Sequence, residues 1–265
     1  MILLAVLGLA ACTDKQEKTL VLYYSQTGAT KAVAEEIKAQ LGEGVDIEAI
    51  ELENPYDNDF QATINRAKDE MENGTLPALK PLKSNLNDYD VIFLGYPVWF
   101  GTYALPIESL LKTESFEGKK VVTFCTFGSG GLQSSTKNLK EALPKAEVIE
   151  GYGVRNARKE AVKDELNRFL IERGFKAGEV EALPDFAQHH PVEEMEYAIF
   201  DQACLNYQFP LGTPVSVASR ETPTGTDYEY TVKSADQDGV EQTTTIYVTV
   251  GKEEGAQAEF TQVIR

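Results

Sequence analysis

Cysteine, histidine and tryptophan are scarce in this chain of 265 residues, which contains three cysteines, two histidines and one tryptophan. The two histidines, His189 and His190, are adjacent. The cysteines and histidines of this chain do not have the spacing that is typical of a zinc site. With two adjacent histidines, a Ser-His-Asp or Cys-His catalytic arrangement is disfavoured. The sequence therefore predicts neither a metal site nor a catalytic side chain.

Positive charge is also in short supply. The chain has 25 lysines and arginines against 42 aspartates and glutamates, a formal net charge of −17 at pH 7. A strongly acidic surface repels nucleic-acid phosphates and anionic lipid headgroups. The composition therefore argues against nucleic acid as a partner and against membrane adhesion by surface charge, and it favours basic proteins as partners.

The apolar run at the N-terminus, residues 1–12, is too short to span a bilayer and is typical of a secretory signal. Its end, Leu9–Cys12, resembles a bacterial lipobox, which implies that the Cys12 thiol is lipidated. Residues 1–18 are then a lipoprotein signal and tether, and the protein is lipid-anchored in the bacterial cell envelope, outside the cytoplasm. The basic residues that usually precede such a run are missing, and if the segment is not a signal we expect a cytoplasmic protein.

Residues 19–174 alternate short apolar runs with amphipathic stretches, which predicts an α/β domain with a parallel sheet covered by helices on both faces. This pattern favours a doubly wound five-stranded sheet, whose ligand crevice lies at the carboxyl ends of the strands. The predicted strands are residues 20–24, 45–50, 90–95, 120–126 and 146–150, and the predicted helices include 60–72 and 157–173.

The composition changes after Gly174. Residues 175–191 are typical of a linker, and residues 192–265 predict a smaller α+β domain with one helix, from Val192 to about Cys204, and an antiparallel meander. Its β segments are expected at residues 213–220, 227–234 and 243–251, where β-branched residues are frequent. The order of helix and strands, with the turns at residues 211–212 and 224–228, resembles a cystatin-like domain.

The first predicted strand leads directly into Ser25-Gln26-Thr27-Gly28-Ala29-Thr30 and then into a helix. A helix N-terminus presents unpaired N–H groups and the positive end of its dipole, so it attracts anions. Gly28 lets the backbone approach a phosphate, and the hydroxyl groups of Ser25, Thr27 and Thr30 can donate hydrogen bonds. Because the loop lacks the lysine of a nucleoside-triphosphate loop, it is typical of a site for one phosphate monoester. A simple capping role is the alternative for this loop alone.

The strand at residues 90–95 continues into Gly95-Tyr96-Pro97-Val98-Trp99-Phe100-Gly101. With the first loop, this segment resembles the flavodoxin family, which carries Gly-x-Pro-x-Trp-Trp/Tyr-Gly here. The resemblance implies FMN contacts from Pro97, Val98, Trp99, Phe100 and Gly101. It implies that the indole of Trp99 stacks on the flavin and that the Gly101 peptide can reorient toward the ring. The alternative is an aromatic strand end that covers the core.

A third loop, Thr126-Phe127-Gly128-Ser129-Gly130-Gly131, follows the next core strand and opens a helix. Glycines at these positions let backbone N–H groups approach the polar edge of a ligand. The resemblance extends to flavodoxins with Cys-Thr-x-Gly-x-x-Gly in this place, where Phe127 stands at a position often held by histidine. The FMN contacts implied for this loop come from Thr126, Phe127, Gly128, Ser129 and Gly130.

The resemblance as a whole implies an FMN-binding electron-transfer protein that exchanges electrons with redox partner proteins. The chemistry then belongs to the cofactor, and we expect the many acidic residues to lower its reduction potential. One alternative is a flavodoxin-like NAD(P)H-dependent quinone reductase. Another is an envelope binding protein that acts through its C-terminal domain.

Overall fold

The computed structural model describes residues 17–205, 207, 211–235 and 239–264. The apolar N-terminal segment and Cys12 lie outside the described residues. Within those four ranges, no helix combines the length and the apolar character that crossing a membrane requires.

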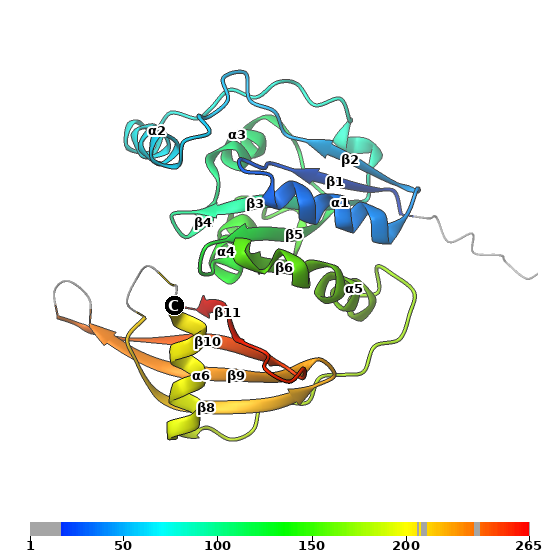
Figure 1. Cartoon of the computed structure of the whole chain (residues 1–265). Coiled ribbons are helices and arrows are strands. Elements are labelled where there is room, and N and C mark those ends of the chain that lie inside the picture. The colour runs from blue at the N-terminus through cyan, green and yellow to red at the C-terminus, as the bar shows by residue number, and fades with distance from the viewer. Residues whose placement is uncertain (1–16, 206, 208–210, 236–238, 265) are drawn as a thin grey trace, which may run out of the picture.

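Five parallel strands form the central sheet of the N-terminal part, in the order β2-β1-β3-β5-β6 (Figure 1). This is the doubly wound sheet that the alternation of apolar runs predicts. Its strands are β1 (Thr19–Tyr23), β2 (Val45–Ala49), β3 (Val91–Trp99), β5 (Lys120–Phe127) and β6 (Glu147–Arg155). A two-residue strand, β4 (Thr102–Tyr103), pairs antiparallel with the end of β3.

Helices cover both faces of this sheet because its central strands are apolar on both sides. In β3, Ile92 and Leu94 pack on one face, against α3 and α4, whereas Val91 and Phe93 pack on the other, against α1 and α5. All four side chains are at most 1% exposed. The helices are α1 (Ala29–Leu41), α2 (Phe60–Asn73), α3 (Leu105–Thr113), α4 (Leu132–Ala142) and α5 (Val162–Glu172), with 3₁₀ turns η1 (Leu86–Asp88) and η2 (Asn156–Ala161).

Two of these strands extend several residues beyond their predicted ends. β3 runs to Trp99, so residues 96–99 belong to a strand rather than to a loop. β6 was expected to end at Glu150 but reaches Arg155. The continuation was missed because it contains glycine at a position where a strand pattern has an apolar residue. A Cβ on Gly151 would lie 1.7 Å from the carbonyl oxygen of Thr123, so the strand requires glycine there.

The C-terminal part is a five-stranded antiparallel sheet in the order β11-β10-β9-β8-β7, with one helix packed against it. The smaller α+β unit with an antiparallel meander is therefore present, as predicted. Its elements are β7 (His190–Pro191), α6 (Glu194–Cys204), β8 (Thr213–Thr222), β9 (Gly225–Ala235), β10 (Glu241–Gly251) and β11 (Ala258–Ile264). β7 comes from the end of the predicted linker and pairs with β8.

The last strand, β11, was not predicted. Ala258, Phe260 and Val263 are its buried residues, so the alternation of period two breaks after Phe260. The break has a structural cause, since the register between β10 and β11 shifts between Tyr247 and Val248. A β-bulge of this kind inserts one residue and moves every later side chain to the opposite face.

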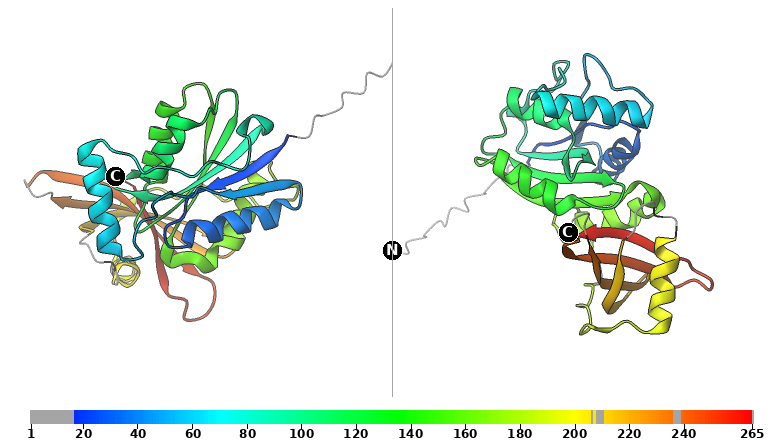
Figure 2. Two further views of the ribbon diagram at one scale, coloured as in Figure 1. Left: turned by 90° about the horizontal axis from the view of Figure 1, so that it is seen from above. Right: turned by 90° about the vertical axis from the view of Figure 1, so that its left-hand side faces the viewer.

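The two parts are stacked, with the C-terminal sheet below the parallel sheet in Figure 1. β11 is the strand of the antiparallel sheet that lies next to β6, as the side view of Figure 2 also shows. The C-terminal strand therefore passes the carboxyl end of the parallel sheet, which is the edge where doubly wound proteins bind ligands.

Candidate functional site

The first predicted loop connects the carboxyl end of β1 to α1. Gly28 is the N-cap of α1, with a φ of 90°, and supplies no side chain to the positive end of the helix dipole. The hydroxyl oxygen of Ser25 accepts a 3.1 Å hydrogen bond from the backbone N–H of Lys31. The Gln26 amide is bonded to the Asp57 carbonyl at 2.8 Å, which ties the loop to the segment before α2.

The three hydroxyl groups predicted for phosphate contact have different surroundings. The hydroxyls of Thr30 and Thr126 lie 2.9 Å apart and both residues are buried, so this pair joins the first loop to the third. Ser25 is partly buried and engaged with Lys31, whereas Thr27 is exposed. Thr27, Gly28 and Ala29 line a cavity of about 480 Å³.

Basic side chains lie beside the first loop although the loop itself has none. Arg155, Lys159 and Lys163, from β6, η2 and α5, line the same cavity as Thr27 and Gly28. The loop itself carries no charged residue, but the cavity beside it is lined by these three basic residues and by Glu36. No sequence pattern linked these three residues to the loop, because they follow it by more than 120 positions. The folding of the parallel sheet brings them together.

The second loop is a tight turn between β3 and β4. Phe100 and Gly101 are its two central residues, with φ values of 50° and 81°, between the paired residues Trp99 and Thr102. Positive φ at both central residues is the geometry of a type I′ turn. Phe100 is the single non-glycine with positive φ among the described residues, and this conformation costs about 1–2 kcal/mol in an L-residue.

The turn decides which aromatic ring faces the cavity. Trp99 is partly buried, and its ring makes edge contacts with Tyr24 and Tyr56 at centroid distances of 5.9 and 5.2 Å. Phe100 is 47% exposed and lines a cavity of about 700 Å³. Phe100 therefore lines this cavity and Trp99 does not.

The third loop follows Phe127, the buried last residue of β5. Gly131 caps α4 with a φ of 121°, and a Cβ at this position would lie 2.6 Å from a methyl carbon of Val98. The loop therefore needs glycine to pack against the end of β3. Beside Gly128 there is open space, with no atom within 4 Å of an added Cβ.

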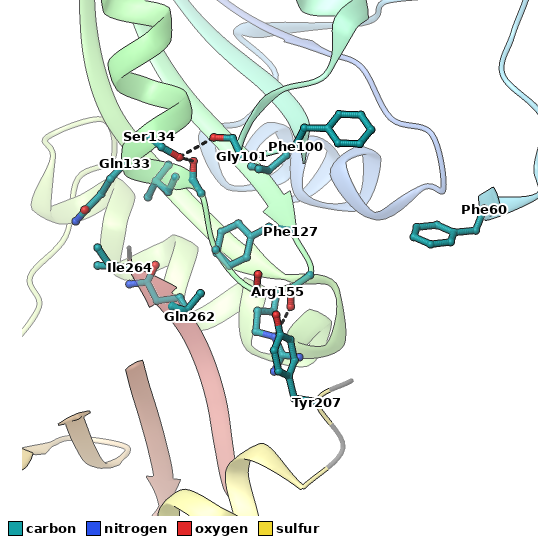
Figure 3. Close-up of a pocket in the computed structure, with 17 residues that line it drawn as sticks. Phe60, Phe100, Gly101, Phe127, Gln133, Ser134, Arg155, Tyr207, Gln262 and Ile264 are labelled. Atoms are coloured by element: carbon teal, nitrogen blue, oxygen red, sulfur yellow. Dashed lines mark hydrogen bonds between the residues drawn. The ribbon is translucent and has the colours of Figure 1, made fainter. Parts of the chain in front are cut away.

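The second and third loops together enclose the cavity of about 700 Å³, a volume within the range of small-molecule sites (Figure 3). Phe127 is a buried part of its wall, between Phe100 on one side and Arg155 with Tyr207 on the other. Phe60, at the start of α2, is 76% exposed and contributes to the lining from further out. The predicted residues on this cavity are Val98, Phe100, Gly101, Phe127, Gly128, Ser129 and Gly130.

Arg155 is the charged group among the described residues that line this cavity. Its Nε donates a 2.7 Å hydrogen bond to the carbonyl of Gly128, and partial burial lowers the pKa of its guanidinium below the ordinary value. The charged group at this cavity is therefore a cation, although the chain as a whole carries a charge of −17. No aspartate or glutamate is among the described residues that line this cavity, and the expected effect of the acidic residues on the reduction potential stays a prediction.

Residues of the C-terminal part also line the cavity, which sequence reasoning missed. They are Tyr207, which follows α6, and Gln262, Val263 and Ile264 at the end of β11. The alternation of apolar residues in β11 was the one sequence signal that could have predicted this strand, and the β-bulge interrupts that alternation.

Taken together, the doubly wound sheet, the open helix N-terminus and the two loops at the strand ends define a nucleotide-binding α/β protein. A family model described as flavodoxin matches residues 18–170, more than half of the chain. The chain belongs to the flavodoxin family.

Solved structures are similar over the same part. A protein from Bacteroides eggerthii, described as a flavoprotein, is 31% identical, with 58% of this chain and 98% of that chain covered and a TM-score of 0.49. One from Bacteroides uniformis is 28% identical, with 57% and 97% covered and a TM-score of 0.50. A flavoprotein from Lactobacillus acidophilus, solved in complex with FMN, is 28% identical, with 58% and 98% covered and a TM-score of 0.48. No curated protein matches this sequence.

Proposed function

We propose that this chain binds FMN and transfers electrons between redox partner proteins. The observation that carries the proposal is the cavity of about 700 Å³ between the Phe100–Gly101 turn and the Gly128–Gly131 loop, on the carboxyl edge of a flavodoxin-family sheet. The cofactor supplies the redox chemistry when it is bound, and the protein supplies its position and electrostatics.

The residues present fit such a cofactor. The first backbone N–H groups of α1, where Gly28 supplies no capping side chain, and the exposed Thr27 offer donors to a phosphate. Arg155, Lys159 and Lys163 line the same cavity and outnumber its one carboxylate, Glu36. The half-exposed ring of Phe100 offers an aromatic face to a planar ring, and the buried Phe127 packs behind the wall of the cavity. The open space beside Gly128 leaves room for the polar edge of a ligand to reach the backbone.

One observation favours a second candidate, an NAD(P)H-dependent quinone reductase. The exposed rings of Phe60 and Phe100 extend the cavity lining outward, which suits a planar acceptor close to a bound flavin. An electron carrier needs no such room, because electrons leave through protein contact.

The two functions are separated by one set of measurements. Purified protein is titrated with FMN, followed by flavin fluorescence, and is then supplied with NADH or NADPH and a quinone. We expect tight FMN binding with no steady-state NAD(P)H oxidation, and electron transfer from the reduced protein to a basic redox protein. Steady-state NAD(P)H oxidation without an added reductase supports the reductase, and absence of FMN binding refutes both.

We also propose that Cys12 is lipidated and that the protein is anchored to a membrane outside the cytoplasm of a bacterial cell. The apolar run that ends in Leu9–Cys12 supports this. Expression of the full chain in a bacterium, followed by mass analysis of the N-terminal peptide, tests it. We expect a diacylglyceryl cysteine at position 12, and a Cys12→Ser chain released from the membrane fraction. An unmodified Met1 in the wild type would point to a cytoplasmic protein.

The cystatin-like resemblance of the C-terminal part supports a further proposal, that this part contacts other proteins of the envelope. One helix packed on a curved antiparallel meander is the arrangement that the resemblance implies. Protein capture by a chain that takes up no FMN would favour this reading over electron transfer.

A further inference from the structure

The third loop makes a direct backbone contact with the C-terminal strand. The N–H of Val263 donates a 2.7 Å hydrogen bond to the carbonyl oxygen of Ser129. At the next residue, Gly130, an added Cβ would lie 2.1 Å from the carbonyl oxygen of Val263. The strand and the loop are therefore in contact through their main chains, at a distance that leaves no room for a side chain on Gly130.

β11 can make this contact because it is an edge strand. It pairs with β10 on one side only, which leaves backbone groups of its other edge free to pair. The side chain of Val263 meanwhile is 4% exposed and belongs to the core of the C-terminal sheet. The residue thus joins the core of one sheet to the loop of the other.

Two arginines strengthen the same junction. The guanidinium of Arg155 donates to the carbonyl of Gly128 at 2.7 Å and to the carbonyl of Phe260 at 2.8 Å, and it lies 4.2 Å from the centroid of the Phe260 ring. Arg158, with 11% of its side chain exposed, contacts Glu165 at 2.8 Å and Glu259 at 3.2 Å. The planar Arg155 donors therefore connect the loop and β11 at two adjacent points.

We propose that β11 is part of the cofactor site: its last residues form one wall of the flavin cavity and hold the Gly128–Gly131 loop in the conformation that binds the ring. This inference rests on the proposed function, because it assigns residues to the same cavity. Gln262, Val263 and Ile264 line that cavity together with the loop (Figure 3). Cofactor binding and docking of the C-terminal sheet are consequently coupled, since both require one loop conformation.

A matched pair of variants in the full-length chain tests the wall. Val263→Pro removes the N–H that the Ser129 carbonyl accepts, whereas Val263→Ala keeps it and loses similar packing. Because one hydrogen bond is lost, we expect FMN to bind about 3- to 10-fold more weakly to Val263→Pro than to Val263→Ala. Equal affinities for the two variants overturn the inference.

A second measurement uses the wild-type protein and so does not depend on whether a variant folds. Amide hydrogen exchange of Val263 is followed in the wild type with and without FMN, and we expect FMN to slow it at least about fivefold through the coupling. The N–H of Tyr197 in α6, bonded to the Glu193 carbonyl at 2.9 Å, serves as an amide away from the junction and is expected to exchange at an unchanged rate. Unchanged exchange at Val263 with FMN bound overturns the inference alone. A wild type that binds no FMN overturns the proposed function, and this inference falls with it.

Discussion

The side-chain hydroxyl of Ser134 donates a 2.7 Å hydrogen bond to the backbone carbonyl of Gly101. The first turn of α4 therefore holds the peptide of the Phe100–Gly101 turn, across 33 positions of sequence. The same hydroxyl is 3.3 Å from the carbonyl of Gly131, so one side chain connects the second loop with the third (Figure 3).

Replacing Ser134 by alanine is expected to free the Gly101 peptide and to weaken FMN binding. Loss of one hydrogen bond corresponds to about 2- to 10-fold in affinity. The measurement is FMN titration of the apo-protein. Ser134→Thr keeps the hydroxyl and serves as the control, and an alanine variant that binds as tightly as this control contradicts the prediction.

Phe100→Gly is expected to move stability and cofactor affinity in opposite directions. Glycine adopts the positive φ of this position without strain, and the lost ring is half exposed, so we expect the free energy of unfolding to rise by about 1 kcal/mol. FMN affinity is expected to fall about 2- to 10-fold because an aromatic contact is lost. Chemical denaturation of the apo-protein and FMN titration measure the two effects.

Trp99→Phe is the companion variant for the neighbouring ring. It keeps an aromatic group against Tyr24 and Tyr56, so we expect it to leave FMN affinity within about twofold of the wild type. If Trp99→Phe weakens binding more than Phe100→Gly, the indole faces the cofactor after all.

Arg155→Gln is expected to lower the reduction potential of bound FMN. A cation on the cavity stabilises the negatively charged reduced flavin more than the neutral oxidised form, and glutamine removes that charge. Arg155→Lys keeps the charge and is expected to retain most of the potential. Equilibration with indicator dyes of known potential measures both variants, and a glutamine variant at or above the wild-type potential refutes the prediction.

We expect ionisation of Tyr152 to lower the free energy of unfolding at alkaline pH. Its hydroxyl donates a 2.8 Å hydrogen bond to Glu165, and burial, followed by the charge of Glu165, raises its pKa above the ordinary value. Because the pKa of Tyr152 is higher in the folded than in the unfolded state, its protonated hydroxyl stabilises the fold. This contribution to the free energy of unfolding is complete below about pH 10, the ordinary tyrosine pKa, and is lost as the pH rises toward the folded-state value. We expect Tyr152→Phe to be less stable near pH 8 by about 1 kcal/mol and to lose stability less steeply from pH 9 to 11. Urea unfolding across this range tests it, and identical slopes for both proteins count against it.

The three loops were predictable because each is a local feature of the sequence. Gly28, Gly101 and Gly128 follow apolar strands directly, and the carboxyl ends of parallel strands meet at one edge of the sheet. The part of the site that was missed depends on irregularities. Arg155 lies beyond the Gly151 bulge in β6, and Val263 lies beyond the bulge in β11, so neither followed from an apolar period.

Which of the adjacent rings of Trp99 and Phe100 lines the cavity was also not predictable from a local pattern. Adjacent residues at a strand end point to opposite sides, and which side is the cavity depends on where the turn begins. The pairing of Trp99 with Thr102 makes Phe100 the first turn residue and directs the two rings apart.

The amino-acid sequence by itself determined the doubly wound sheet, its family and the order of the three loops, because these follow from short-range patterns of apolar residues and glycine. Only the tertiary structure decided that an arginine and the last strand of the chain complete the cavity. Val263 and Ser129 are 134 positions apart, and their contact depends on how two separately formed sheets pack, which no local pattern encodes.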